Sequence, residues 1–185
     1  MANHIHLSLQ AAVTTVEQVL KPALRSDNPL AVEQVEVLAQ LLIFLDQRVD
    51  QLTPAARAAL TQNIELGRRV ASLAAPDLNV VALRDALSKA ELVLADGWAS
   101  LEDLDRAERA VTAGISCAVR QAAGASDLVR SSLDETVVAA SLEQLALARA
   151  WVLPQGWEPN PNAVDDLDTV LRRLAPTSAQ KGNTP

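Results

Sequence analysis

Cysteine, histidine and aromatic residues are scarce in this chain of 185 residues. The sequence holds one cysteine, two histidines, three tryptophans and one phenylalanine, and it has no tyrosine. A single cysteine cannot form an internal disulfide, so the composition gives no indication of an oxidising compartment. Aromatic residues make up 2% of the chain. With few β-branched residues beside them, this excludes an ordinary β-sandwich or β-barrel.

Basic charge is also scarce. The formal net charge is −7, and the 16 lysine and arginine residues are dispersed among 23 acidic ones. A nucleic-acid-binding protein usually presents a basic face that neutralises phosphates, so we expect no nucleic-acid partner. The excess of arginine over lysine, together with the high alanine content, is typical of a GC-rich bacterial source.

Long hydrophobic runs are missing. The longest uninterrupted run covers residues 41–45, whereas a bilayer-spanning helix needs roughly 20 apolar residues. The first ten residues, MANHIHLSLQ, contain neither a basic segment nor a continuous apolar one, so we expect no signal peptide. These features predict a cytoplasmic protein without a membrane partner.

Alanine and leucine dominate what is present. The 33 alanines and 29 leucines favour helices, and 49% of the chain is apolar, which is enough to form a core. Apolar residues recur at steps of three and four along almost the whole sequence. This periodicity predicts an all-α fold: a single bundle of about six to seven amphipathic helices over residues 1–175, followed by a disordered polar tail over residues 176–185.

Capping residues and charge pairs agree with that prediction. Asn28 followed by Pro29, Ser100 with Asp103 three residues later, and Asn162 are each expected to begin a helix. Acidic residues precede basic ones by four positions on five of the predicted helices, which is the favourable order. The pairs are Glu17–Lys21, Glu65–Arg69, Asp85–Lys89, Glu102–Arg106, Asp105–Arg109 and Asp168–Arg172.

The predicted helix over residues 31–52 has an unusually wide apolar stripe. Val37, Leu41 and Phe44 form a second row beside the main one, so this helix must be covered on two sides. We expect it to lie centrally in the bundle or at a subunit interface, with a homodimer as the commonest form of such an interface. Small residues gather instead in the third and fifth helices, around Gly67 and Gly114, where close helix contacts are expected.

A segment rich in tryptophan and proline follows the sixth helix. Trp151 and Trp157 place half of the aromatic residues within eleven positions, together with Pro154, Pro159 and Pro161. Tryptophan is enriched at interface hot spots, so this segment is a candidate binding surface. The alternative is that the two indoles anchor the loop over the end of the bundle.

Catalytic and metal-binding patterns are weak. His4 and His6 are expected to be solvated near the terminus, and Cys117 is expected to act as a small buried hydrophobic residue. The acidic clusters at residues 102–105 and 165–168 compensate helix dipoles, while Asp46 and Asp50 lie off the main stripe. We therefore predict no catalytic residues, no metal and no cofactor.

Glu108 and Gln144 are polar residues in register with apolar stripes. Burying a charge costs several kcal/mol unless it is paired, so both positions require an explanation. They lie at the edge of the bundle, line a polar pocket between helices, or fix the register between helices.

These patterns favour a non-enzymatic, cytoplasmic interaction or assembly module, of the adaptor, inhibitor, immunity or chaperone-like kind. The expected interaction residues are Val37, Leu41, Phe44, Trp151 and Trp157. The expected partner is a protein, either a basic one attracted by the acidic chain or a second copy. The alternative is a helix-bundle ligand-binding protein or small enzyme that uses Glu108 and Gln144 in a pocket.

Overall fold

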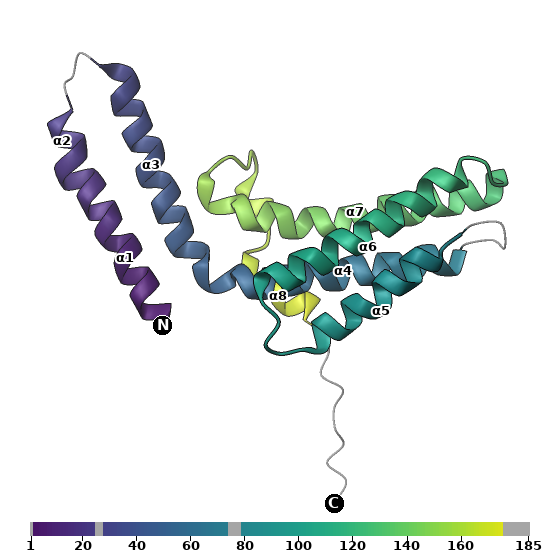
Figure 1. The fold of residues 1–185 in the computed structure, drawn as a ribbon. Helices are drawn as coiled ribbons and strands as arrows, with labels where there is room; N and C mark the ends of the chain where they lie inside the picture. Colours follow the sequence, from purple (N-terminus) through teal and green to yellow (C-terminus); the bar gives the residue numbers. More distant parts are fainter. Residues whose placement is uncertain (1, 25–27, 74–78, 176–185) are drawn as a thin grey trace, which may run out of the picture. The chain divides into compact units, whose positions relative to one another are not determined.

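A computed structural model describes residues 2–24, 28–73 and 79–175 (Figure 1). The structure is 87% helical and has no strand within these ranges, which confirms the all-α prediction. The described chain divides into two compact units: unit 1 is Met1–Leu52 with Trp151–Pro161, and unit 2 is Thr53–Ala150 with Asn162–Pro185. That residues 1–175 form one domain stays a prediction, and the predicted disordered tail lies outside the described residues.

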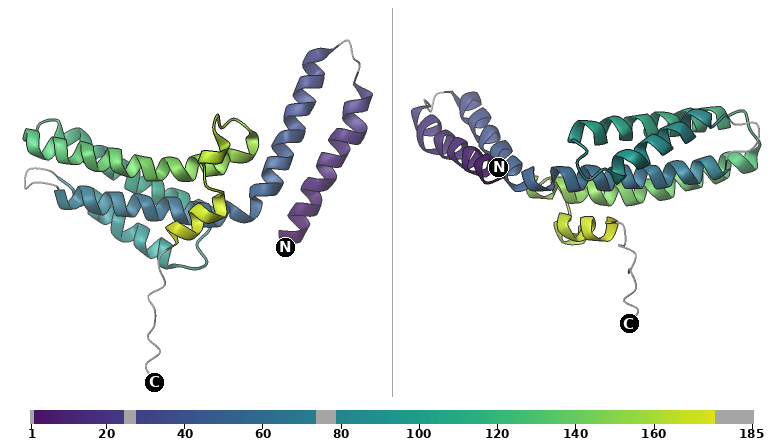
Figure 2. Two further views of the ribbon diagram at one scale, coloured as in Figure 1. Left: turned by 180° about the vertical axis from the view of Figure 1, so that it is seen from behind. Right: turned by 60° about the horizontal axis from the view of Figure 1, so that its bottom comes forward.

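Unit 1 is built on a helical hairpin. Its first arm is α1 (Ala2–Thr15), continued by a π-helical turn, η1 (Val16–Leu20), and the short α2 (Lys21–Ala23). The second arm is α3 (Pro29–Arg48), followed by a 3-10 turn, η2 (Val49–Gln51). Both views of Figure 2 show α1 and α3 lying side by side, and their contacts are the most numerous in the unit.

The π-helical turn has a local cause. Pro22 lacks an amide hydrogen and its ring crowds the preceding turn of an α-helix. The chain widens there, so that the Lys21 amide donates to the Val16 carbonyl, five residues back. The helix ends one residue after the proline, at Ala23.

The two arms meet along a seam of regularly spaced residues. The inward side chains recur at steps of three and four on both helices, as in a coiled coil. They are Leu9, Val13 and Val16 on the first arm, and Val35, Ala39 and Leu42 on α3. Because all of them are buried or half-buried, this seam occupies only one side of α3, and the second apolar row is left on the other side.

An ion-pair clamp closes the end of the hairpin. His6 Nδ1 lies 2.6 Å from Asp46 Oδ1, and His6 Nε2 lies 3.0 Å from Asp50 Oδ2. The expectation of two solvated histidines was therefore wrong for His6, whose ring is half-buried. The second arm runs antiparallel to the first, and α3 and η2 present one carboxylate each, one turn apart. Hydrogen bonds to Asp50 and Asp46 raise the pKa of His6 above its ordinary value of 6.5.

We predict that this clamp makes the hairpin less stable as pH rises. A raised pKa means that the charged histidine stabilises the fold fully below pH 6.5 and that the contribution is lost as pH rises through the folded-state value. His6→Gln should therefore lower Tm, followed by circular dichroism, more at pH 5.5 than at pH 8.5. His4→Gln, at an exposed position, is the control. Equal losses at the two pH values would contradict the clamp.

Unit 2 is a bundle of antiparallel helices. Its elements are α4 (Leu52–Leu73, of which Leu52 belongs to unit 1), α5 (Val81–Ala95), α6 (Leu101–Ala122), most of α7 (Asp127–Val152) and α8 (Leu167–Leu174). Helix α4 buries nine residues, whereas α3 buries only Ala39 and Arg48. The central position in a bundle therefore belongs to α4. Of the two positions expected for the helix over residues 31–52, the central one was wrong, and the subunit interface stays a prediction.

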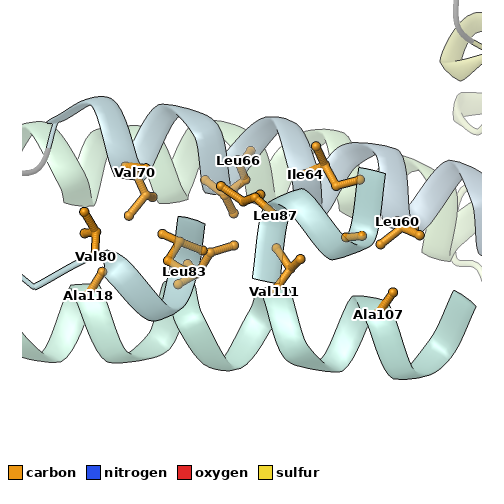
Figure 3. Close-up of a cluster of buried hydrophobic side chains, with 14 of the residues drawn as sticks. Leu60, Ile64, Leu66, Val70, Val80, Leu83, Leu87, Ala107, Val111 and Ala118 are labelled. Carbon is orange, nitrogen blue, oxygen red and sulfur yellow. The ribbon is translucent and has the colours of Figure 1, made fainter. Parts of the chain in front are cut away.

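Glycines set the spacing inside unit 2. Figure 3 shows Leu83 and Leu87 of α5 between residues of α4 and α6, among them Val70 and Val111. A Cβ added at Gly114 would lie 3.0 Å from the Leu83 Cα, which is a backbone atom. A Cβ at Gly67 would meet the Leu87 side chain at 2.8 Å. The close contacts expected at both glycines are thus confirmed.

The helix ends match most of the predicted caps. The Ala31 amide donates to Asn28 Oδ1 at 3.1 Å, and Ser100 forms a capping box with Asp103. The last helix begins later than predicted. Its N-cap is Asp166 rather than Asn162, because the Asp166 side chain accepts a hydrogen bond from the Thr169 amide. Three of the predicted pairs bond as expected: Asp85–Lys89, Glu102–Arg106 and Asp105–Arg109.

We predict that Gly114→Ala destabilises the protein by about 1–3 kcal/mol, because the new methyl group meets helix backbone that cannot rotate away. Gly67→Ala should cost less, since the end of the Leu87 side chain can move and alanine favours the helix by about 1 kcal/mol. Urea unfolding of both variants measures the difference. Gly97→Ala, with open space around it, is the control. A larger loss for Gly67→Ala would show that backbone contact does not set the spacing.

Candidate functional site

An aromatic and cationic cluster joins α3 to the end of α7 within unit 1. The rings of Phe44 and Trp151 pack edge to face, with centroids 6.2 Å apart and planes at 89°. The Arg48 guanidinium carbon lies 6.0 Å from the Phe44 centroid and 5.7 Å from that of Trp151. Such aromatic and cation–π contacts are favourable.

Arg48 was missed by sequence analysis. It is only 8% exposed, its Nε donates to the Trp151 carbonyl at 2.9 Å, and its Nη1 donates to Gln51 Oε1 at 2.9 Å. A signal was available, because Arg48 follows Phe44 by four residues and so continues the second apolar row of α3. A charge at that position requires a partner, which the C-terminal end of α7 supplies.

Beside this cluster lies an open cleft of about 370 Å³, entirely within unit 1. One wall belongs to α3, and the other to the 3-10 turn η3 (Leu153–Gln155) and the two residues after it. Its apolar lining consists of Val37, Leu41, Ile43, Phe44, Pro154 and Trp157. The remaining lining residues are three glutamines and a glycine, so no charged residue lines the cleft.

The turn after η3 presents Trp157 to solvent. Gly156 has φ of 72°, a left-handed conformation that a residue with a Cβ rarely adopts, and its amide donates to the Leu153 carbonyl. The next side chain, Trp157, is 75% exposed. At the cleft wall, Gln155 Oε1 is buried without a hydrogen-bond partner among the described residues.

Four of the five residues predicted to mediate interaction line the cleft: Val37, Leu41, Phe44 and Trp157. The fifth, Trp151, packs against Phe44 in the aromatic and cationic cluster. Val37 is 53% exposed and Leu41 47% exposed, so this part of the second apolar row is not covered within the described chain. Sequence analysis treated the helix row and the tryptophan segment as separate features, because 103 residues separate Arg48 from Trp151.

The second predicted site, Glu108 and Gln144, lies in unit 2. Both side chains are half-buried and both bond to Asn63, which is 8% exposed. Asn63 Nδ2 donates to Glu108 Oε1 at 3.0 Å, and Gln144 Nε2 donates to Asn63 Oδ1 at 3.2 Å. Asn63 therefore links α6 to α7 through α4, and sequence analysis missed it because nothing marks its buried position.

Burial raises the pKa of Glu108, and the nearby Asp105 carboxylate adds to the rise, while the Asn63 bond opposes it. Glu108 also lines a shallow recess on α6 with Asp105, Arg109 and Ser116. Gln62, next to Asn63, is 6% exposed and has a buried Nε2 without a partner among the described residues. The arrangement is a polar network within a helical core, with one carboxyl group at its edge.

The acidic clusters serve structural purposes. Asp103 completes a capping box, Asp166 caps α8, and Asp165 forms an ion pair with Arg173 at 3.0 Å. Asp46 and Asp50 hold His6. Within the described ranges, no group of three or more histidine, cysteine or acidic side chains is placed to hold a metal ion.

One helical stretch, Asp127–Gln155, is long and apolar enough to cross a membrane, by length and composition only. An 18-residue window within this stretch has a mean hydropathy of 1.3, and 17% of that window is buried in the structure. A single such helix is weak evidence of a membrane span. The expectation of no membrane partner rested on uninterrupted apolar runs, and it stays a prediction.

No protein-family model, curated protein or solved structure matches this chain.

We predict that Asn63→Ala destabilises unit 2 by about 1–3 kcal/mol, because the buried part of Glu108 loses its donor. Glu108→Gln should have a different effect. The raised pKa means that ionising Glu108 opposes folding, so wild-type stability falls as pH rises from about 4.5 through the folded-state value. The advantage of Glu108→Gln, measured as Tm, should grow between pH 4 and pH 7. A constant difference across that range would contradict the burial of this carboxyl group.

Proposed function

We propose that the protein is a non-enzymatic interaction or assembly module. The surface that carries this proposal is the cleft formed by α3 and the Trp157 segment. Specific interfaces use an apolar centre, depleted of charge and containing aromatic anchors, and the cleft has that composition. In support, Leu41 and Val37 remain half-exposed although a chain of net charge −7 has ample charged residues to place there.

The aromatic and cationic cluster of Phe44, Arg48 and Trp151 suits a binding surface because it is rigid. Arg48 is fixed by hydrogen bonds at Nε and Nη1 and by two aromatic rings. A wall fixed in this way loses little conformational entropy when a partner binds, so more of the contact energy appears as affinity. The occupant we propose is an apolar segment of a protein.

A second candidate function, small-molecule binding, is favoured by the link from Asn63 to Glu108 and Gln144. Glu108 and Gln144, the two polar side chains predicted to converge, both form hydrogen bonds with Asn63. The network bonds mainly to itself, however, and the recess beside it is shallow. We therefore prefer register and packing between α4, α6 and α7 as its role.

We predict that Leu41→Glu abolishes partner binding, because it places a charge in an uncharged apolar cleft, where burial costs several kcal/mol. Tagged wild-type and variant proteins would be compared for the proteins they retain from a lysate of the source organism. Leu142→Glu, at a 67% exposed leucine of α7 in unit 2, is the matched control. Retention of the same proteins by both variants would remove the cleft as the binding surface.

A further inference from the structure

We infer that the occupant of the cleft is a second copy of this chain, and that each copy inserts Trp157 into the cleft of the other. The inference rests on the proposed function and deepens it by naming the partner. It follows from the position of Trp157, the chemistry of the cleft wall, the charge of the face and the area available.

Trp157 and the cleft lie on the same surface. Trp157 is 75% exposed, and it stands at the rim of the opening that it lines with Val37 and Leu41. A two-fold interface brings identical patches together, so a patch must carry both a projecting group and a recess that receives it. This patch carries both, and a two-fold axis beside Trp157 places each indole over the opposite cleft.

The chemistry of the cleft matches an indole. Its walls are mainly apolar, and Gln155 Oε1 is an acceptor without a partner in the single copy. Indole has a large apolar body and one N–H donor, with no acceptor to satisfy. The indole of the second copy would fill the cleft, and a small rotation of Gln155 would let its oxygen accept the Nε1 hydrogen.

Charge favours a second copy over a basic partner. No charged residue lines the cleft. The apolar residues of α3 on this side, named here the α3 outer face, are Leu30, Val37, Leu38, Leu41, Phe44 and Leu45. Of the acids nearby on α3, Glu36 is bonded to Lys21 of the other arm at 2.8 Å, and Glu33 is exposed one turn before Val37. A basic partner would find no carboxylate inside the cleft, whereas the uncharged clefts of two copies meet without repulsion.

The exposed apolar area is sufficient for a dimer. A stable interface buries about 600–1000 Å² on each partner, of which about 60% is apolar, or roughly 350–600 Å². A fully exposed aliphatic side chain offers about 100 Å² and a tryptophan about 200 Å². At exposures from 40% for Leu38 to 66% for Leu30, the five aliphatic residues of the outer face and Trp157 together present on the order of 400 Å².

The test is sedimentation velocity on the full chain over a range of concentrations. We expect a dimer, and we expect Trp157→Ala to raise its Kd about 30-fold, the loss typical of an interface hot spot. Trp98→Ala is the matched control, because Trp98 is 93% exposed in unit 2, and it should leave Kd unchanged. A monomer at all concentrations overturns the inference, and so does a dimer that both variants weaken equally.

A mixing experiment tests the reciprocal arrangement. Trp157→Ala lacks the indole but keeps the α3 wall of the cleft, while Leu41→Glu keeps the indole beside an obstructed cleft, with folding of each checked by circular dichroism. In a mixed dimer, the indole of the Leu41→Glu chain can enter the cleft of the Trp157→Ala chain, which restores one of the two indole–cleft contacts. The mixture should therefore contain more dimer than either variant alone at the same total concentration. No recovery on mixing overturns the reciprocal insertion.

The outcomes also separate this inference from the proposed function. A monomeric wild type that retains a lysate protein in a Leu41-dependent manner overturns the second copy as occupant but leaves the interaction module standing. A monomeric wild type whose retained proteins are indifferent to Leu41→Glu overturns both.

Discussion

Helix α3 carries apolar residues on two opposite sides, and a helix of this kind must be covered on both. One side packs against α1 along a seam of regularly spaced residues that includes Ala39. The other side is covered only near its C-terminal end, where Phe44 and Arg48 meet Trp151. The remaining length, around Val37 and Leu41, forms the cleft. The architecture of unit 1 and its proposed role both follow from this one constraint.

The two units use polar groups in different ways. In unit 2, Asn63 ties Glu108 and Gln144 together where helices pack closely, so the polar bonds specify which helix faces meet. In unit 1, His6 and its two carboxylates close the hairpin, and Arg48 anchors the end of α7. The polar bonds there hold elements around an apolar surface. That surface is the proposed binding site, whereas the polar groups of unit 2 bond mainly to one another.

The predictions from sequence were correct for features that depend on residues close together in the chain. The capping box at Ser100 and the cap at Asn28 depend on side chains that reach backbone amides three residues away. The close approach at Gly114 followed from the absence of a side chain at one helix position. Errors arose where the cause is distant in sequence: His6 was expected in solvent because its two partners lie 40 and 44 residues further along the chain.

By itself, the sequence determined the all-α class, most of the helix ends, and the existence of two apolar rows on the helix over residues 31–52. These depend on propensity, periodicity and bonds within a few residues. Only the tertiary structure decided which row α1 covers, that Trp151 joins Phe44 and Arg48, and that Asn63 links Glu108 to Gln144. Such contacts join residues tens of positions apart, and side-chain periodicity describes one helix at a time. It says which face must be covered and leaves open what covers it.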